Sequence, residues 1–222
     1  MQVQAPVSLV IFGLSNILSD LFDCAIECGL ALGKVVIDQP EAPGARDRTL
    51  EQRLDALQGI VARPVVESLD DFTPAPGERY LLGPTTPMRA GLAARLRDRF
   101  GLSFTTLVHP SAHVSRLARL GEGVFIGANS VVGAGAVLGD HVFVNRGVTI
   151  GHDTRIGSFS RVQPGCNLGG LSRIGERVTL GIGSILVERL DIGDDAFVCA
   201  GSLVTADVPA GTRYFNRRGR AA

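Results

Sequence analysis

The sequence predicts two kinds of structure in one chain: a small α/β domain, followed by a prism of short, stacked parallel strands. In residues 1–107, apolar strand-like runs alternate with helical segments, which is the pattern of an α/β domain. From Val108 to Val204, every sixth residue is aliphatic without exception. Neither a helix of period 3.6 nor a strand of period 2 produces a strict period of six, whereas stacked coils of short parallel strands do.

Two further positions of each hexad support the prism. If the aliphatic residue is counted first, the fifth position is small or aliphatic throughout, as in Val124, Ser130 and Ala136, which fits a narrow interior. Glycine recurs at the second position, as in Gly127 and Gly133, and we expect these glycines to turn corners with unusual backbone angles.

These hexads resemble the repeats of the hexapeptide-repeat acyltransferases. The family folds as a left-handed parallel β-helix with eighteen residues in each triangular coil, and the resemblance covers about half of this chain. It implies a fold of the class α/β plus β, in which a small Rossmann-like domain precedes the β-helix. Members of the family are trimers with active sites between prisms, so the resemblance also implies a homotrimer.

The composition favours an ordered globular protein without a charged partner. The chain has 222 residues, 45% of them hydrophobic and 20% charged, and its 22 basic and 22 acidic residues cancel. No global charge therefore favours nucleic acid or a membrane surface. The apolar run from Val7 to Leu14 is too short for a membrane span and lacks a basic leader. The four cysteines form no CxxC motif, so we expect reduced thiols and a cytoplasmic location.

The elements of the α/β domain follow from local signals. We expect strands at 7–12, 34–38 and 80–82, and helices at 51–60 and 88–100, with a short helix starting in 68–72. Asn16 is expected to cap a helix that runs to about Cys28 and ends at Gly29. The opening strand, helix and strand make a Rossmann-like βαβ unit.

This order resembles the sialic-acid O-acetyltransferase and nucleotide-amino-sugar N-acetyltransferase group of the family. In that group the first domain holds the nucleotide of a nucleotide-linked sugar, through a glycine-rich loop after the first strand. Here the loop reads Gly13-Leu14-Ser15-Asn16, and only the first glycine of the family pattern is present. The resemblance makes Gly13, Ser15 and Asn16 candidate substrate-binding residues, while a plain tight turn at Gly13 remains an alternative.

A second resemblance concerns the chemistry. The segment from Asn145 to Asp153 matches the family's catalytic stretch, in which an Asn lies seven residues before a His that an acid follows. By this resemblance His152 is the general base, Asp153 orients it and Asn145 contacts the substrate. His152 occupies the third position of its hexad, so its side chain is expected to point outward. Gly170 follows eighteen residues later in the same column, and the family uses the backbone N–H at this place to hold the thioester carbonyl of acetyl-CoA.

Other candidates depend more on the family pattern. Arg161 stands where the N-acetyltransferase branch often has a second His, and we expect it to contact an anionic group of cofactor or acceptor. Ile182 and Ala200 occupy positions that line the pantetheine channel in family members. Arg217 and Arg218 would suit the phosphates of coenzyme A, although a basic tail is an alternative.

The predicted organisation is therefore a nucleotide-sugar domain at 1–107, a β-helix acyltransferase domain at 108–209 and a C-terminal tail at 210–222. The predicted function is acetyl-CoA-dependent acylation of an amino or hydroxyl group of a sugar in surface glycan synthesis, with no metal, and we expect the sugar to be nucleotide-linked. Two alternatives remain open. One is a non-catalytic trimeric scaffold, and the other is a metal-dependent hydratase of the carbonic anhydrase type, although His141 and His152 are eleven residues apart where that family pairs two His five apart.

Overall fold

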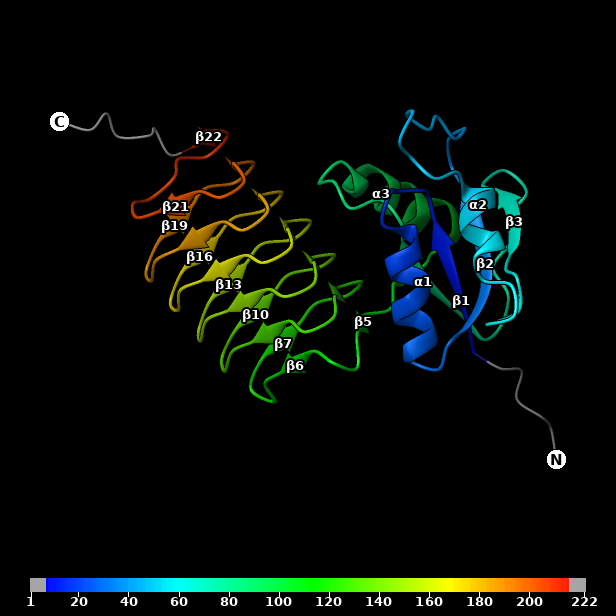
Figure 1. Ribbon diagram of the computed structural model, residues 1–222, viewed down its shortest axis with the longest axis horizontal. Coiled ribbons are helices and arrows are strands. Elements are labelled where there is room, and N and C mark those ends of the chain that lie inside the picture. Colours follow the sequence, from blue (N-terminus) through cyan, green and yellow to red (C-terminus); the bar gives the residue numbers. More distant parts are fainter. Residues whose placement is uncertain (1–6, 216–222) are drawn as a thin grey trace. The chain divides into compact units, whose positions relative to one another are not determined.

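The computed structural model describes residues 7–215, which divide into two compact units. One unit contains the residues up to Thr85 together with Arg89–Pro110, and the other contains Thr86–Met88 and the residues from Ser111 onward. Figure 1 shows the strands of the first unit flanked by helices and the second unit as a stack of coils. The predicted succession of an α/β unit and a strand prism is confirmed.

The first unit is built on a parallel sheet in the order β3-β2-β1-β4. Its elements are β1 (Ser8–Phe12), α1 (Leu18–Glu27), β2 (Ala31–Ile37), α2 (Leu50–Asp55), β3 (Val65–Ser68), β4 (Glu78–Leu82), α3 (Arg89–Phe100) and β5 (Leu107–Val108). The central strand β1 is almost fully buried from Leu9 to Phe12, as the apolar run predicts. The strand order reverses direction at β1, which lies between β2 and β4, so the carboxyl ends of β1 and β4 form a topological switch point.

Three local predictions for this unit are wrong. The helix α1 begins after Ile17 without a side-chain cap, and Asn16 Nδ2 instead donates to Asp47 Oδ1 at 3.0 Å. The helix α2 ends at Asp55, and 56–60 are turns. No helix starts in 68–72: Val65–Ser68 form the edge strand β3, because the backbone of β2 offers parallel hydrogen bonds to this valine-containing segment.

The second unit consists of three parallel sheets in which register partners are eighteen residues apart, as Val137 and Arg155 are, except in the last coil, where Phe197 and Arg213 are sixteen apart. Sheet B contains β8 (Phe125–Ile126), β11 (Phe143–Val144), β14 (Arg161–Val162), β17 (Thr179–Leu180), β20 (Phe197–Val198) and β22 (Arg213–Tyr214). Sheet C contains β6 (His113–Val114), β9 (Val131–Val132), β12 (Thr149–Ile150), β15 (Asn167–Leu168), β18 (Ile185–Leu186) and β21 (Leu203–Val204). Sheet D contains β7 (Arg119–Leu120), β10 (Val137–Leu138), β13 (Arg155–Ile156), β16 (Arg173–Ile174) and β19 (Asp191–Ile192).

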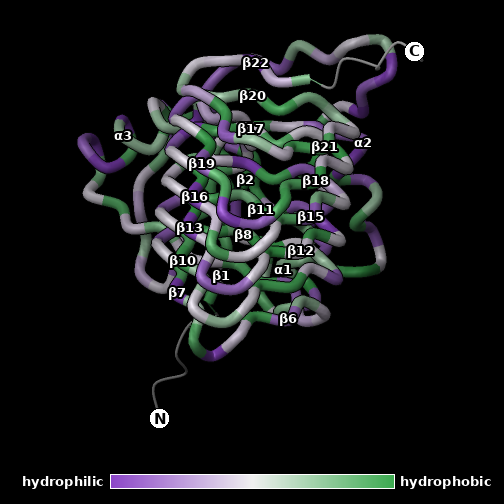
Figure 2. The backbone as a smooth tube through the Cα atoms, turned by 90° about the vertical axis from the view of Figure 1, so that its left-hand side faces the viewer, coloured by the Kyte–Doolittle hydropathy of each residue, from purple (hydrophilic) through white to green (hydrophobic). Residues whose placement is uncertain are grey.

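The interior of the prism follows the hexad pattern. First-position residues are buried from Ile126 to Val204, and fifth-position residues are buried from Val124 to Val208. Figure 2 shows hydrophobic stretches recurring from coil to coil. Fifth-position hydroxyls also join coils, since Ser160 Oγ donates to Gly175 O at 2.8 Å and accepts from Val178 N at 2.9 Å. The prism is therefore held together by aliphatic packing and by hydrogen bonds that run along its axis.

The prediction about the second-position glycines is wrong. The residues with positive φ occupy the fourth position of the hexads, for example Gly123, Asn129 and Gly135. The second-position glycines are needed for a different reason, which is the close approach of the next coil. A Cβ on Gly133 would lie 2.8 Å from the backbone nitrogen of His152, a group that cannot move without shifting the whole coil.

Replacement of Gly133 by alanine is therefore expected to destabilise the β-helix by about 1–3 kcal/mol through overpacking. A urea unfolding curve followed by circular dichroism measures the change. Gly91→Ala is the control, because Gly91 lies in α3 with open space around its Cβ position, and alanine favours a helix. Equal unfolding midpoints for Gly133→Ala and wild type would show that the coils can separate to admit a methyl group.

Candidate active site

His152 lies in the turn between β12 of sheet C and β13 of sheet D, which we call the C–D corner. As predicted for a third-position residue, its side chain is exposed, with 60% of its surface accessible. Its Nδ1 lies 2.8 Å from Asp153 Oδ2. A carboxylate at this distance accepts the Nδ1 proton, which leaves Nε2 with a free lone pair that can take a proton from a substrate.

The backbone fixes Asp153 in the position that this contact requires. Asp153 adopts a left-handed conformation with φ 56°, which aspartate tolerates better than most residues. Its backbone nitrogen donates to Ala134 O at 2.9 Å, and the carbonyl of His152 accepts from Leu171 N at 2.9 Å. Hydrogen bonds to the coils on both sides thus hold the two residues of the pair.

Gly170 lies one coil further along the same corner and directly beside the imidazole of His152. A Cβ on Gly170 would lie 2.8 Å from His152 Nε2 and 2.9 Å from its Cδ2. Only a glycine therefore leaves room for the ring in this orientation. The structure brings His152, Asp153 and Gly170 together, as their spacing in the sequence suggests.

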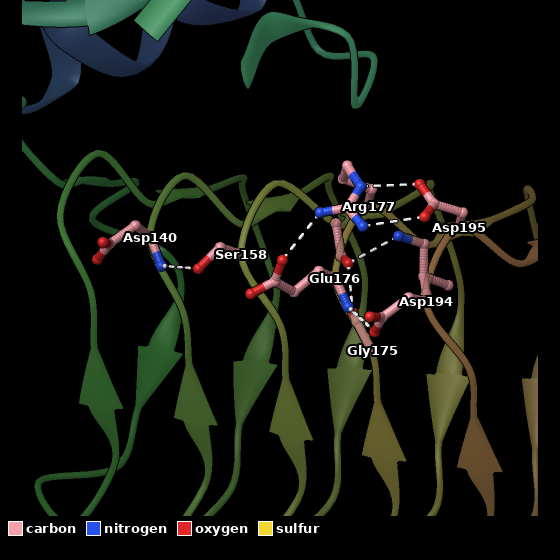
Figure 3. Close-up of polar contacts among 9 residues, drawn as sticks. Asp140, Ser158, Gly175, Glu176, Arg177, Asp194 and Asp195 are labelled. Atoms are coloured by element: carbon pink, nitrogen blue, oxygen red, sulfur yellow. Dashed lines mark hydrogen bonds and ion pairs between the residues drawn. The ribbon is translucent and has the colours of Figure 1, made fainter. Parts of the chain in front are cut away.

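The amide of Gly170 donates no hydrogen bond within residues 7–215. The corner between sheets D and B differs at this position of the hexad (Figure 3). There, Asp140 N donates to Ser158 Oγ at 3.1 Å and Glu176 N donates to Asp194 Oδ1 at 2.8 Å, so the next coil satisfies each amide. At the C–D corner no side chain performs this task for Gly170. Its N–H is therefore available to a carbonyl oxygen of a ligand.

Three other predicted residues lie at the corner between sheets B and C. Asn145 is only 7% exposed, and its Oδ1 accepts from Arg146 N at 2.8 Å, so its side chain also supports the turn. Ile182 and Ala200 share one column of this corner and are exposed, Ile182 to 59%. Within one chain, sheet C separates these residues from His152.

The outer surface of sheet C between the two corners carries exposed aliphatic side chains on both sides of the polar pair Thr149 and Asn167. Val131, Ile185 and Leu203 alternate with interior residues, so they point outward, and they are 41%, 46% and 45% exposed. Val187, at the adjoining C–D corner, is also exposed. Aliphatic side chains exposed together in this way typically mark a surface that a ligand or another protein covers.

Arg161 begins β14 in sheet B, so the structure does not bring it beside His152 within one chain, contrary to expectation. Its guanidinium is half-buried, and its Nε donates to Thr179 Oγ1 at 3.1 Å. Among residues 7–215 it has no carboxylate partner. Burial lowers the pKa of this guanidinium, because the charged form loses contact with water.

The loop after β1 lies at the switch point of the first unit. Gly13 has φ +77°, and a Cβ there would meet Pro84 at 2.9 Å and the carboxylate of Asp38 at 3.0 Å. Ser15 Oγ donates to Gly83 O at 2.8 Å, so this hydroxyl joins the loops after β1 and β4. The sequence reading missed Asp38, whose carboxylate accepts from Arg95 Nη2 at 3.1 Å. An acid at the end of the second strand of a βαβ unit was the signal that could have identified it.

Arg217 and Arg218 lie outside the described residues. Within 7–215, no group of three or more His, Cys, Asp and Glu side chains is placed to hold a metal ion. In the same part of the chain, no helix has both the length and the apolar character that crossing a membrane requires.

The fold and the site define a hexapeptide-repeat protein of the transferase class. The family model of the bacterial transferase hexapeptide matches residues 117–152, and that of the hexapeptide repeat of succinyl-transferase matches residues 172–206. A comparison with curated protein sequences finds no match.

Solved structures extend the similarity to almost the whole chain. The acetyltransferase domain of PglB from Neisseria gonorrhoeae FA1090, solved in complex with acetyl coenzyme A, matches 94% of this chain and 96% of its own, with a TM-score of 0.77 and 25% identity. A histidine-substituted perosamine N-acetyltransferase from Caulobacter crescentus, in complex with CoA and GDP-perosamine, matches 94% of this chain and 93% of its own, with a TM-score of 0.77 and 27% identity. WeeI from Acinetobacter baumannii AYE has the same fold at 16% identity and a TM-score of 0.56, with 96% of this chain and 98% of its own covered.

These comparisons confirm three predictions from the sequence. The chain is a hexapeptide-repeat acyltransferase, its coils form a left-handed parallel β-helix, and a Rossmann-like α/β domain precedes them.

Proposed function

We propose that this chain transfers the acetyl group of acetyl-CoA to an amino group of a nucleotide-linked sugar, as a step in surface glycan synthesis. A hydroxyl group is the alternative acceptor. The observation that carries the proposal is the arrangement at the C–D corner, where Asp153 holds one nitrogen of His152 and the other nitrogen lies beside Gly170. Among the matched structures, one holds acetyl coenzyme A and another holds CoA with GDP-perosamine.

The residues have distinct tasks in this reaction. His152 Nε2 takes a proton from the acceptor nitrogen as that nitrogen forms its bond to the acetyl carbon. Gly170 N–H donates to the carbonyl oxygen, on which negative charge develops. The carbon–sulfur bond breaks, and CoA leaves as the free thiol. The exposed side chains of Ile182 and Ala200 fit the pantetheine arm, and the loop at Gly13, with Ser15 and Asp38, fits the nucleotide.

The domain assignment and location belong to this proposal. Residues 1–107 hold the nucleotide, and residues 108–209 carry the transfer. We place the protein in the cytoplasm, which agrees with four cysteines that are all free.

The direct test mixes the purified chain with acetyl-CoA and a panel of UDP-, GDP- and TDP-linked amino sugars. Free thiol release is followed optically, and the product is identified by mass spectrometry. The same nucleotide sugars without the amino group separate N-acetylation from O-acetylation. The proposal predicts thiol release with at least one amino sugar. An absence of release with every acceptor at enzyme excess would refute it.

We further propose that the chain assembles as a homotrimer through sheet C. The exposed Ile185 and Leu203 gain by burial against a neighbouring prism, and a three-fold arrangement closes the assembly. In such packing a corner of one chain also lies beside a corner of its neighbour, so residues of two chains can form one site.

The double variant Ile185→Asp/Leu203→Asp is expected to be a monomer, because two carboxylates would lose their hydration in the interface. Analytical ultracentrifugation measures its mass, and circular dichroism checks that the β-helix persists. Arg119→Asp, on the outer face of sheet D, is the matched control and should stay trimeric. A variant of unchanged trimeric mass would place the interface elsewhere.

Arg161 is proposed to contact an anionic group of the donor or the acceptor. A half-buried guanidinium without a carboxylate is stabilised when an anion meets it. Arg161→Ala should raise the KM for one substrate about tenfold, which corresponds to about 1.4 kcal/mol. Steady-state kinetics with each substrate varied in turn measures this effect. Unchanged constants for both substrates would show that solvent alone satisfies Arg161.

A further inference from the structure

Two arginines lie side by side on the outer face of sheet D and form no ion pair with any residue in 7–215. Arg155 of β13 and Arg173 of β16 are register partners in adjacent coils, and both are exposed. Because Ile156 and Ile174 point into the prism, the arginines before them point outward. Partner strands are about 4.8 Å apart, so two positive charges occupy neighbouring positions. Like charges in such positions repel each other unless an anion lies between them.

In the described part of the chain, neither arginine is paired with a carboxylate. Among residues 7–215, the guanidinium groups of Arg155 and Arg173 form no hydrogen bond or ion pair. Asp191 is the register partner of Arg173 in the following coil, but it forms no ion pair with it. The neighbouring corner shows the contrast: Arg177 donates to both carboxylate oxygens of Asp195, at 2.8 and 2.9 Å (Figure 3).

The position of the pair relates it to the candidate active site. Arg155 follows His152 by three residues, and Arg173 follows Gly170 by three residues. Three residues of extended chain span at most about 10 Å, so the Cα atoms of the two arginines lie within that distance of the Cα atoms of His152 and Gly170. On the sheet D side, the coils that carry His152 and Gly170 thus each present an arginine that has no ion pair among residues 7–215.

We infer that Arg155 and Arg173 bind the diphosphate of the nucleotide-linked acceptor while its sugar lies at His152. Guanidinium groups bind phosphate oxygens through paired, charge-assisted hydrogen bonds, and two of them match the two charges of a diphosphate. Coenzyme A also carries phosphates, but its whole pantetheine arm separates them from the thioester. In a nucleotide-linked sugar, a single ring separates the diphosphate from the acetylated group. This inference rests on the proposed function and assigns the acceptor to the sheet D side of the corner.

The test compares Arg155→Gln/Arg173→Gln with Arg119→Gln. Arg119 is also exposed and unpaired on the outer face of sheet D, but it lies two coils from Arg155. The double variant should raise the KM for the nucleotide-linked amino sugar at least about tenfold, and the KM for acetyl-CoA should stay within a factor of two. Arg119→Gln should leave both constants unchanged. A raised KM for acetyl-CoA alone, or no change in either constant, would overturn the inference.

A binding experiment tests the pair independently of activity. Isothermal titration with inorganic pyrophosphate should detect binding to wild type and to Arg119→Gln, and an at least tenfold weaker affinity for the double variant. Equal affinity in all three proteins would refute the subsite. If wild type acetylates no acceptor and pyrophosphate still binds through the pair, the proposed function fails while the anion site stands.

Discussion

Replacement of His152 by alanine is expected to lower kcat at least about 100-fold, because the acceptor then loses the group that removes its proton. The KM for acetyl-CoA should change little, since the imidazole contributes mainly in the transition state. His152→Asn is the second variant, because its side chain can still bond to Asp153 but cannot take up a proton. Both variants should therefore be equally inactive in the thiol-release assay.

His113→Ala provides the matched control for this loss. His113 is also an exposed histidine of the prism, but it belongs to β6 in sheet C, two coils below β12. It should retain wild-type activity. Retention of more than about a tenth of wild-type kcat by His152→Ala would remove the general-base role, because a general base contributes about 100-fold or more.

The β-helix could be predicted from the sequence because each coil repeats the same packing problem. Because the interior admits only aliphatic side chains at positions such as Ile126, Val132 and Leu138, the sequence shows a strict period of six. The α/β unit has no such period in its sequence. The strand Val65–Ser68 forms because β2 offers a free edge, and Asn16 does not cap α1 because its side chain donates to Asp47, 31 residues further along the chain.

The sequence predicted those parts of the candidate site that follow from the spacing of eighteen residues per coil. The spacing of eighteen places Gly170 beside His152, and the same spacing relates Arg155 to Arg173, although that pair is noticed only once sheet D is seen as a surface. The orientation of the His152 ring, in contrast, does not follow from this spacing. That Nε2 lies only 2.8 Å from the place of a Cβ on Gly170 depends on the hydrogen bond to Asp153 and on the left-handed backbone there, and the repeat pattern of the sequence specifies neither of these.

Replacement of Gly170 by alanine should accordingly lower kcat at least about tenfold with little loss of stability. The added Cβ would lie 2.8 Å from His152 Nε2, and an exposed imidazole can rotate away from it more easily than a backbone can shift. The ring then leaves the position from which it reaches the acceptor. Steady-state kinetics measures the loss, and a thermal melt should show a midpoint within a few degrees of wild type.

A double-mutant cycle identifies the origin of this loss. If alanine at 170 acts by displacing the imidazole, then Gly170→Ala should have almost no further effect in a His152→Ala background, where no ring is present to displace. If the two losses in activation free energy instead add, Gly170 contributes independently of His152, through its N–H to the carbonyl oxygen or through space for the ligand. Additivity would contradict the displacement account while leaving Gly170 in the site. Full activity of Gly170→Ala would remove it from the site altogether.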